Sequence, residues 1–168
     1  MTKEIQAWLK LMRETHPLEP GRVLEIGSKN VNGSPRFHFQ DAQEYVGIDS
    51  EGGPGVDRVL HGEKALREFG VDSFDTVICT EVLEHDLAFF TTVFGIHAML
   101  KAGGHFFVST PTFGFPLHRF PKDYYRFGED TYREMFFWRM QILDLRHLDE
   151  FQAGQGVTLA GLAKKLDA

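Results

Sequence analysis

A glycine-bearing loop between two apolar strands restricts the fold of this chain more than any other feature. Residues 22–26 and 45–48 have the short, largely apolar pattern of buried strands, and the loop at 27–34 follows the first of them. The second strand ends on Asp49. In open α/β sheets, such a loop lets backbone approach a ligand, and an acid about 20 residues further on accepts hydrogen bonds from ribose hydroxyls. The pattern therefore predicts a site for a nucleoside-containing cofactor.

Helical and strand-like segments alternate along the rest of the chain. The apolar periodicity predicts an N-terminal helical segment within residues 1–20, with its helix at 3–15, and further helices at 63–69, 87–100 and 129–139, with a weak helical stretch at 36–41. Strands are expected at 56–60, 74–79, 105–109, 141–148 and 157–162. The sequence thus predicts one α/β domain over residues 1–168. Its sheet is Rossmann-like and doubly wound, mostly parallel with an antiparallel C-terminal hairpin strand, and carries helices on both faces.

Charge and residue content disfavour several classes of protein. The formal net charge of −6 disfavours non-specific binding to nucleic acid, because phosphates need a basic surface. No apolar run approaches the roughly 18 residues that a membrane-spanning helix needs, so no membrane association is expected. The single cysteine, Cys79, cannot form an internal disulfide and predicts a cytoplasmic setting. Nothing in the sequence indicates a homo-oligomer, although none is excluded.

Four segments together resemble the class I S-adenosylmethionine-dependent methyltransferases. They are similar to that family's first motif at residues 23–27, its ribose-binding motif at 45–49, its fourth-strand motif at 74–85, and its glycine turn at 99–104. The fourth-strand segment is most similar to that of quinone-biosynthesis methyltransferases. A narrower resemblance, to bacterial and phage-type members, rests on residues 31–34, 53–57 and 118–127.

The resemblance implies that S-adenosyl-L-methionine is the cofactor and S-adenosyl-L-homocysteine the product. It implies that Asp49 binds the ribose, that His61 and Gly62 lie at the adenine edge, and that Thr80 and Glu81 contact the methionine moiety. For Glu25, contact with the cofactor ammonium and a role in ordering the loop remain open alternatives. The complete set of cofactor-binding residues expected from the resemblance is Glu25, Gly27, Ser28, Gly33, Asp49, Ser50, His61, Gly62, Thr80 and Glu81.

The glycine loop departs from the family pattern. Where relatives have Gly-x-Gly-x-Gly, this loop has only Gly27 and Gly33, with Lys29 near its middle. Asn30 and Asn32 tolerate left-handed backbone better than most residues, which offsets part of the difference. The same departure argues against a dinucleotide cofactor, since Gly-x-Gly-x-x-Gly is also absent.

Acid–base catalysis and substrate cover are expected after the fourth and fifth strands. His85, His118 and Tyr124 are the candidate catalytic residues, with His85 as a general base or, alternatively, a histidine that only stabilises a helix start. The stretch at 110–128 is long for a connection and is expected to be a substrate lid. The alternative is that its aromatics cover core while Asp123 and Arg126 form an ion pair. The histidines and Cys79 show no local ligand spacing such as His-x-x-x-His, so no metal site is predicted.

The function that this reading implies is transfer of a methyl group, in line, to an oxygen or nitrogen of an acceptor that is expected to be a small molecule. Two alternatives remain open. One is a non-catalytic S-adenosylmethionine-binding module that acts through a partner protein. The other is a nicotinamide-dependent oxidoreductase, which would be stabilised by NAD and not by S-adenosylhomocysteine.

Overall fold

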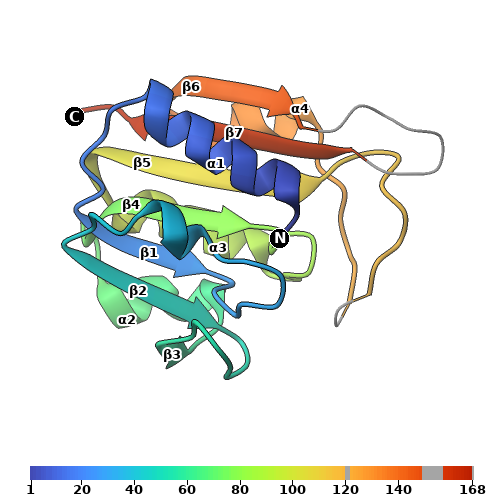
Figure 1. The fold of residues 1–168 in the computed structure, drawn as a ribbon, viewed down its shortest axis with the longest axis horizontal. Helices are drawn as coiled ribbons and strands as arrows, with labels where there is room; N and C mark the ends of the chain where they lie inside the picture. Colours follow the sequence, from blue (N-terminus) through green and yellow to red (C-terminus); the bar gives the residue numbers. More distant parts are fainter. Residues whose placement is uncertain (120–121, 149–156, 168) are drawn as a thin grey trace.

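A seven-stranded sheet forms the centre of the computed structural model, which describes residues 1–119, 122–148 and 157–167. The strand order is β3-β2-β1-β4-β5-β7-β6 (Figure 1). β1 to β5 pair in parallel, whereas β7 is antiparallel to both of its neighbours. The expected mostly parallel sheet with an antiparallel C-terminal hairpin is therefore confirmed. The strands are β1 (Arg22–Ile26), β2 (Glu44–Asp49), β3 (Arg58–Val59), β4 (Phe74–Thr80), β5 (Leu100–Pro111), β6 (Met140–His147) and β7 (Thr158–Lys165).

Helices cover both faces of this sheet (Figure 1). On one face lie α1 (Lys3–Thr15) and the 3-10 turn η1 (Pro35–His38). On the other lie α2 (Ala65–Phe69), which follows the short turn η2 (Gly62–Lys64), α3 (Phe89–Met99), and the short α4 (Glu129–Thr131) with its continuation η3 (Tyr132–Phe136). Alternate residues of each strand point to opposite faces, so β4 contributes Val77 to one core and Ile78 to the other.

The N-terminal helix forms over the residues that its periodicity predicts. Ile5, Trp8, Leu9 and Met12 are all buried, and the Thr2 hydroxyl caps the helix by accepting a hydrogen bond from the Ile5 amide at 3.4 Å. The Trp8 ring packs edge-on against Phe107 of β5, with ring centroids 6.0 Å apart. No helix within the described residues is both long and apolar enough to cross a membrane.

Several boundaries differ from the sequence prediction. α3 covers Phe89–Met99 instead of 87–100, and residues 100–104, predicted as the helix end and a glycine turn, already belong to β5, with Gly103 in the left-handed region at φ +75°. The third strand shrinks from the predicted 56–60 to Arg58–Val59. The early start of β5 follows from tertiary pairing, because the register between β4 and β5 begins with Phe74 opposite Leu100.

The predicted helix at 129–139 is shorter, and its second half is a wide π turn. Phe136 and Phe137 are adjacent in sequence and both buried, which a regular helix facing a sheet does not achieve. The Tyr132 hydroxyl lies inside the core and donates to the Leu159 carbonyl at 2.8 Å. The need to bury three aromatic rings against β7 therefore overrides the regular helix.

Candidate functional site

The candidate site lies where the carboxyl ends of β1, β2, β4 and β5 meet (Figure 1). The chain order reverses between β1 and β4, which is the point where open α/β sheets bind ligands. The loops that leave these strands cover residues 27–34, 50–57, 81–88 and 112–128. All the residues discussed below lie on these loops, at the strand ends, or on the turn that follows β3.

Gly27 makes the first close contact of this site. Its φ is +82°, and an added Cβ would lie 2.2 Å from Cγ2 of Val82, so the β1 loop packs directly on the β4 loop. The amides of Gly27 and Ser28 both donate to the Ile48 carbonyl, at 2.8 and 3.0 Å. Ser28 is buried, and its hydroxyl has no hydrogen-bond partner among the described residues. The turn predicted from the glycine therefore forms, and it is held by β2.

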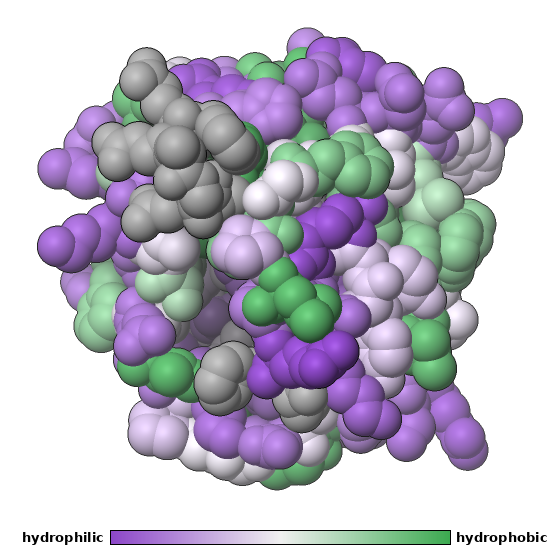
Figure 2. Space-filling view, turned by 90° about the vertical axis from the view of Figure 1, so that its right-hand side faces the viewer, coloured by the Kyte–Doolittle hydropathy of each residue, from purple (hydrophilic) through white to green (hydrophobic). Residues whose placement is uncertain are grey.

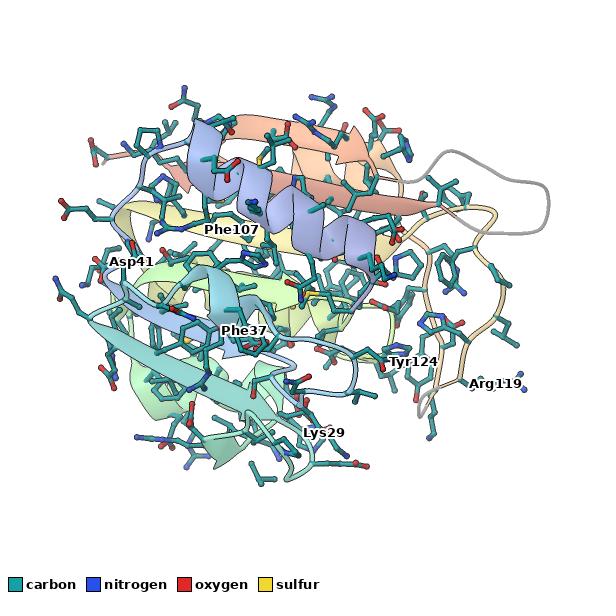
Figure 3. All side chains as sticks on the ribbon, in the orientation of Figure 1. Lys29, Phe37, Asp41, Phe107, Arg119 and Tyr124 are labelled. Atoms are coloured by element: carbon teal, nitrogen blue, oxygen red, sulfur yellow. The ribbon has the colours of Figure 1, made fainter. Side chains whose placement is uncertain are left out.

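The position where relatives carry a middle glycine is occupied by Lys29, and its side chain turns aside. The lysine stem lies along Gly53, whose added Cβ would meet Lys29 carbons at 3.1 Å. The ammonium pairs with Glu51 at 2.7 Å, on the β2 side of the loop (Figure 3). The Asn30 amide donates to the Pro54 carbonyl at 2.8 Å, which ties the two loops together. The facing loop thus accommodates the lysine that stands in place of the expected glycine, through contacts at Glu51 and Gly53.

Asp49 lies at the end of β2, where the sequence predicts it. Its Oδ2 accepts from the Lys29 amide at 3.1 Å and its Oδ1 from the Glu51 amide at 3.0 Å. The Ser50 hydroxyl, 3.4 Å from Oδ1, is exposed beside it. A carboxylate offers about four lone-pair sites, so the two backbone hydrogen bonds leave about two, one of which faces the Ser50 hydroxyl.

Glu25 and Gly33 face the other side of the loop. Glu25 is 2% exposed and accepts a hydrogen bond from the Tyr45 hydroxyl at 2.7 Å. Burial raises the pKa of Glu25 to about 7, against the opposing effect of the Tyr45 hydrogen bond. Gly33, at φ +109°, packs on Gln6 of α1. The contact with Tyr45 joins β1 to β2, and both roles left open for Glu25 stay predictions.

His61 and Gly62 follow β3. His61 is exposed, and Gly62 starts the turn η2 close to α3, because an added Cβ would lie 2.8 Å from Cγ2 of Thr92. Gly62 therefore has a packing role of its own, and its predicted contact with an adenine edge stays a prediction.

The end of β4 carries a backbone feature that the sequence did not indicate. Glu81, directly after Thr80, has φ +57°, a left-handed conformation that costs a residue other than glycine about 1–2 kcal/mol. Two hydrogen bonds to Ser109 of β5 hold it there: the Glu81 amide donates to the carbonyl at 2.9 Å, and the Ser109 hydroxyl donates to Oε1 at 3.0 Å. Strain of this kind tends to gather at functional sites.

Beyond Glu81, the fold gathers one buried acid and two histidines. Glu84 has no exposed surface, and neither of its carboxylate oxygens accepts a hydrogen bond from any described residue. Its Oε1 lies 3.5 Å from Nε2 of His85 and 3.8 Å from Nε2 of His118. Burial, and then the charge of Glu81, raises the pKa of Glu84 well above its ordinary value. Burial also lowers the pKa of His118.

Sequence reasoning found both histidines but missed Glu84 as a site residue. The absence of local ligand spacing led to the expectation of no metal site, yet Glu84, His85 and His118 offer ligand atoms that lie within 4.8 Å of one another. The available signal was the acid directly before His85 in the fourth-strand motif. Its meaning depended on the path of the loop that carries His118.

In the stretch that follows β5, the described residues 112–119 and 122–128 contact each other. The Asp123 carboxylate accepts from the His118 amide at 2.8 Å and pairs with the Arg126 guanidinium, whose Nη2 lies 2.7 Å from Oδ2. The ion pair considered in the sequence analysis is therefore present. An open hollow of about 290 Å³ lies beside it, lined by Phe115, Leu117, Asp123, Tyr124, Tyr125 and Arg126.

The aromatic residues of this loop divide between core and surface. Phe127 is buried, and the Tyr125 ring packs on Phe89 of α3 with centroids 4.8 Å apart. Phe113 and the candidate catalytic Tyr124 are exposed, at 70% and 39% (Figure 3 labels Tyr124). Phe120 lies outside the described residues. On the face that Figure 2 turns toward the viewer, hydrophobic side chains are interspersed with hydrophilic ones, so this side of the molecule is not a continuous apolar patch.

Comparison with known proteins identifies the fold. No protein-family model and no curated protein matches the sequence. Among solved structures, 1,6-didemethyltoxoflavin-N1-methyltransferase from Burkholderia thailandensis, bound to 1,6-didemethyltoxoflavin and S-adenosylhomocysteine, is similar with a TM-score of 0.74 and 19% identity, over 98% of this chain and 79% of that one. The site and sheet define a Rossmann-like α/β protein with a ligand-binding switch point.

Two further structures narrow the fold class. The N-methyltransferase NodS from Bradyrhizobium japonicum WM9, in complex with S-adenosylhomocysteine, has a TM-score of 0.70 at 13% identity, over 99% of this chain and 89% of that one. The CurJ carbon methyltransferase has a TM-score of 0.65 at 15% identity, over 99% of this chain and 56% of that one. The chain therefore has the fold of the class I S-adenosylmethionine-dependent methyltransferases.

Proposed function

We propose that this protein is an S-adenosylmethionine-dependent methyltransferase. The observation that carries the proposal is the arrangement at the switch point, where the left-handed Gly27 turn, the Asp49 carboxylate and the strained Glu81 backbone lie at the ends of adjacent strands within a methyltransferase fold. Two structural neighbours are bound to S-adenosylhomocysteine, which supports the same cofactor for this chain. Acceptors named for the neighbours differ, so the fold does not select among them.

The residues at the strand ends fit a nucleoside cofactor with a sulfonium group. Asp49, with its remaining lone pairs, would accept the ribose hydroxyls, and the Gly27–Ser28 backbone would lie under the methionine part. Glu25 stays behind the loop and holds Tyr45. The remaining residues that would line the cofactor are Gly33, Ser50, His61, Gly62, Thr80 and Glu81.

When bound, S-adenosylmethionine supplies a methyl group that is already activated for transfer. The tasks left to the chain are to align the acceptor with that methyl group and to exclude water. Alignment alone is worth about 7–11 kcal/mol in favourable cases. The loop at 112–128 is suited to this, because Tyr124 and the neighbouring hollow lie at the same strand ends. We expect the acceptor to be a small molecule with a reactive oxygen or nitrogen.

A proton must leave most oxygen and nitrogen acceptors during transfer. His85 and His118 are the imidazole side chains at this edge, and an imidazole nitrogen can accept such a proton; general-base catalysis contributes about two to four decades in rate. His85 is oriented by its Nδ1, which contacts the Lys122 carbonyl, so that its Nε2 points to Glu84. One of these histidines, with Tyr124 beside them, would take up the proton.

Thermal unfolding with and without ligand tests the cofactor assignment. S-adenosylhomocysteine is expected to raise Tm, since a ligand stabilises the folded state by RT ln(1 + [L]/Kd), and NAD is not. Asp49→Ala should abolish the shift while the protein stays folded. Asp41→Ala is the matched control, because Asp41 is an exposed acid that pairs with Arg13 near the N-terminal helix (Figure 3).

Three outcomes separate the candidates. No shift with millimolar S-adenosylhomocysteine contradicts the cofactor assignment, and a shift with NAD alone favours an oxidoreductase. A shift without any S-adenosylhomocysteine formation from S-adenosylmethionine across broad acceptor panels favours a non-catalytic module that works through a partner.

A further inference from the structure

The carboxylate of Glu84 is the least satisfied polar group at the site. It is fully buried, and both of its oxygens lack a hydrogen bond from the described residues. The charge of Arg126 acts on it, but this guanidinium already forms a two-pronged pair with Asp123. An ionised carboxylate buried without hydrogen-bond donors costs several kcal/mol, so such groups in proteins are protonated, paired with a cation or bound to metal.

The two histidines beside Glu84 are held in the orientation of metal ligands. Each turns Nε2 toward Oε1 of Glu84, at 3.5 Å for His85 and 3.8 Å for His118. Each also presents Nδ1 to an oxygen: that of His85 contacts the Lys122 carbonyl, and that of His118 lies 3.5 Å from Oδ2 of Asp123. Metal-bound histidines almost always have such a carbonyl or carboxylate behind the other ring nitrogen, because it fixes the tautomer and the ring.

The spacing of the three ligand atoms suits a small cation. They lie within 4.8 Å of one another, and ligands about 2.0–2.2 Å from zinc in tetrahedral geometry are roughly 3.4 Å apart, so modest rotation of the imidazoles closes the site. Two imidazoles and one carboxylate are the donors of many catalytic zinc sites, and three protein ligands leave a position open.

We propose that Glu84, His85 and His118 bind a divalent transition-metal cation, for which zinc is the probe. Magnesium should bind more weakly, because it prefers oxygen ligands. Asp123, held by Arg126, is a positioning residue, because it accepts a hydrogen bond from the His118 amide at 2.8 Å and so fixes the backbone that carries this ligand. The open coordination position would hold water or an oxygen of the acceptor; this last step rests on the proposed methyl transfer, whereas binding of the cation does not.

Calorimetric titration of zinc chloride into EDTA-treated, dialysed protein tests the site. One equivalent of zinc should bind, and Co²⁺ in the same protein should give the visible absorption of a four- or five-coordinate centre. Glu84→Gln and His118→Ala should each weaken zinc binding at least tenfold. The matched control is His147→Ala, because His147 also lies near a carboxylate, 3.6 Å from Glu129, but in an exposed pair.

The result that overturns the proposal is an absence of zinc binding, or binding that both site variants retain. Circular dichroism of each variant checks folding, and His118→Ala, which changes a half-buried loop residue, keeps the test valid if Glu84→Gln fails to fold. S-adenosylhomocysteine is titrated separately in EDTA. Zinc binding without binding of S-adenosylhomocysteine would support the metal site and contradict the methyltransferase assignment. Binding of S-adenosylhomocysteine without binding of zinc would contradict the metal site and support the methyltransferase assignment.

Discussion

The two halves of the site are built in different ways. At the ends of β1 and β2, the amides of the glycine loop donate hydrogen bonds to the Ile48 and Pro54 carbonyls and to the Asp49 carboxylate, which fix the path of the loop. At the ends of β4 and β5, a buried carboxylate lacks partners and Glu81 has a strained backbone. The first half is a preformed cradle, and the second is an arrangement that an added ligand would complete. The contrast suggests that cofactor binding and acceptor chemistry are separate tasks of the two halves.

The largest effect is expected in the preformed half. Gly27→Ala should lower the free energy of unfolding by about 2–5 kcal/mol, because a left-handed alanine costs about 1–2 kcal/mol and the overlap with Val82 adds about 1–3 kcal/mol. Urea denaturation measures the difference. Gly52→Ala is the control, since its nearest neighbour would be 3.7 Å away. Equal small losses in both variants would show that the turn is not the rigid element described here.

The pH dependence of stability provides the second test. The pKa of Glu25 rises from its ordinary 4.5 to about 7 on folding, so the folded state holds this proton more tightly than the unfolded state. Ionisation of the buried Glu25 therefore lowers the free energy of unfolding. This loss is absent below about pH 4.5, grows up to pH 7, and reaches about 3 kcal/mol above it. Glu25→Gln should remove this loss.

The difference in unfolding free energy between the wild type and Glu25→Gln, measured from pH 5 to pH 8, isolates this group from other titrations. We expect the variant to gain relative stability as pH rises. Glu44→Gln is the control, because Glu44 is a half-exposed acid on β2 that pairs with Arg22. A pH-independent difference would mean that Glu25 is ionised in the folded protein, as direct pairing with a cation would require.

The smallest effect is expected in the incomplete half. Glu84→Met in EDTA should raise the free energy of unfolding by about 1–2 kcal/mol, because an apolar side chain of similar size removes the unpaired buried carboxylate. The same variant should lose any stabilisation by zinc. Urea denaturation in EDTA measures the gain in stability, and urea denaturation with zinc measures the loss of stabilisation by the metal. Glu129→Met, at an exposed acid, is the control. Destabilisation in EDTA would indicate that Glu84 already has the partners it needs.

Much of the fold followed from local pattern. The buried positions Ile5, Trp8, Leu9 and Met12 have the spacing of one helix face, and the strands are short apolar runs next to turns. The fifth strand and the helix at 129–139 were harder, because pairing of Leu100 with Phe74 and burial of Phe136 beside Phe137 are tertiary effects that local propensity does not contain.

The position of the candidate site in the sheet, like the fold, followed in part from local pattern. Gly27 and Asp49 could be assigned to one edge, because parallel strands place all their carboxyl ends together. The direction of Glu25 was left open between two roles, and the structure turns it toward Tyr45. Glu84 was missed because its burial depends on the loop folded over it.

The sequence alone determined the order of strands and helices and the edge of the sheet at which the polar loops gather. Its alternation of apolar and polar residues fixes which side of each element is buried, and this information is local. Only the tertiary structure decided that His118 lies against Glu84 and His85, and that Lys29 turns aside over Gly53. Those contacts join segments far apart in the chain, and their geometry depends on packing that no short pattern of residues encodes.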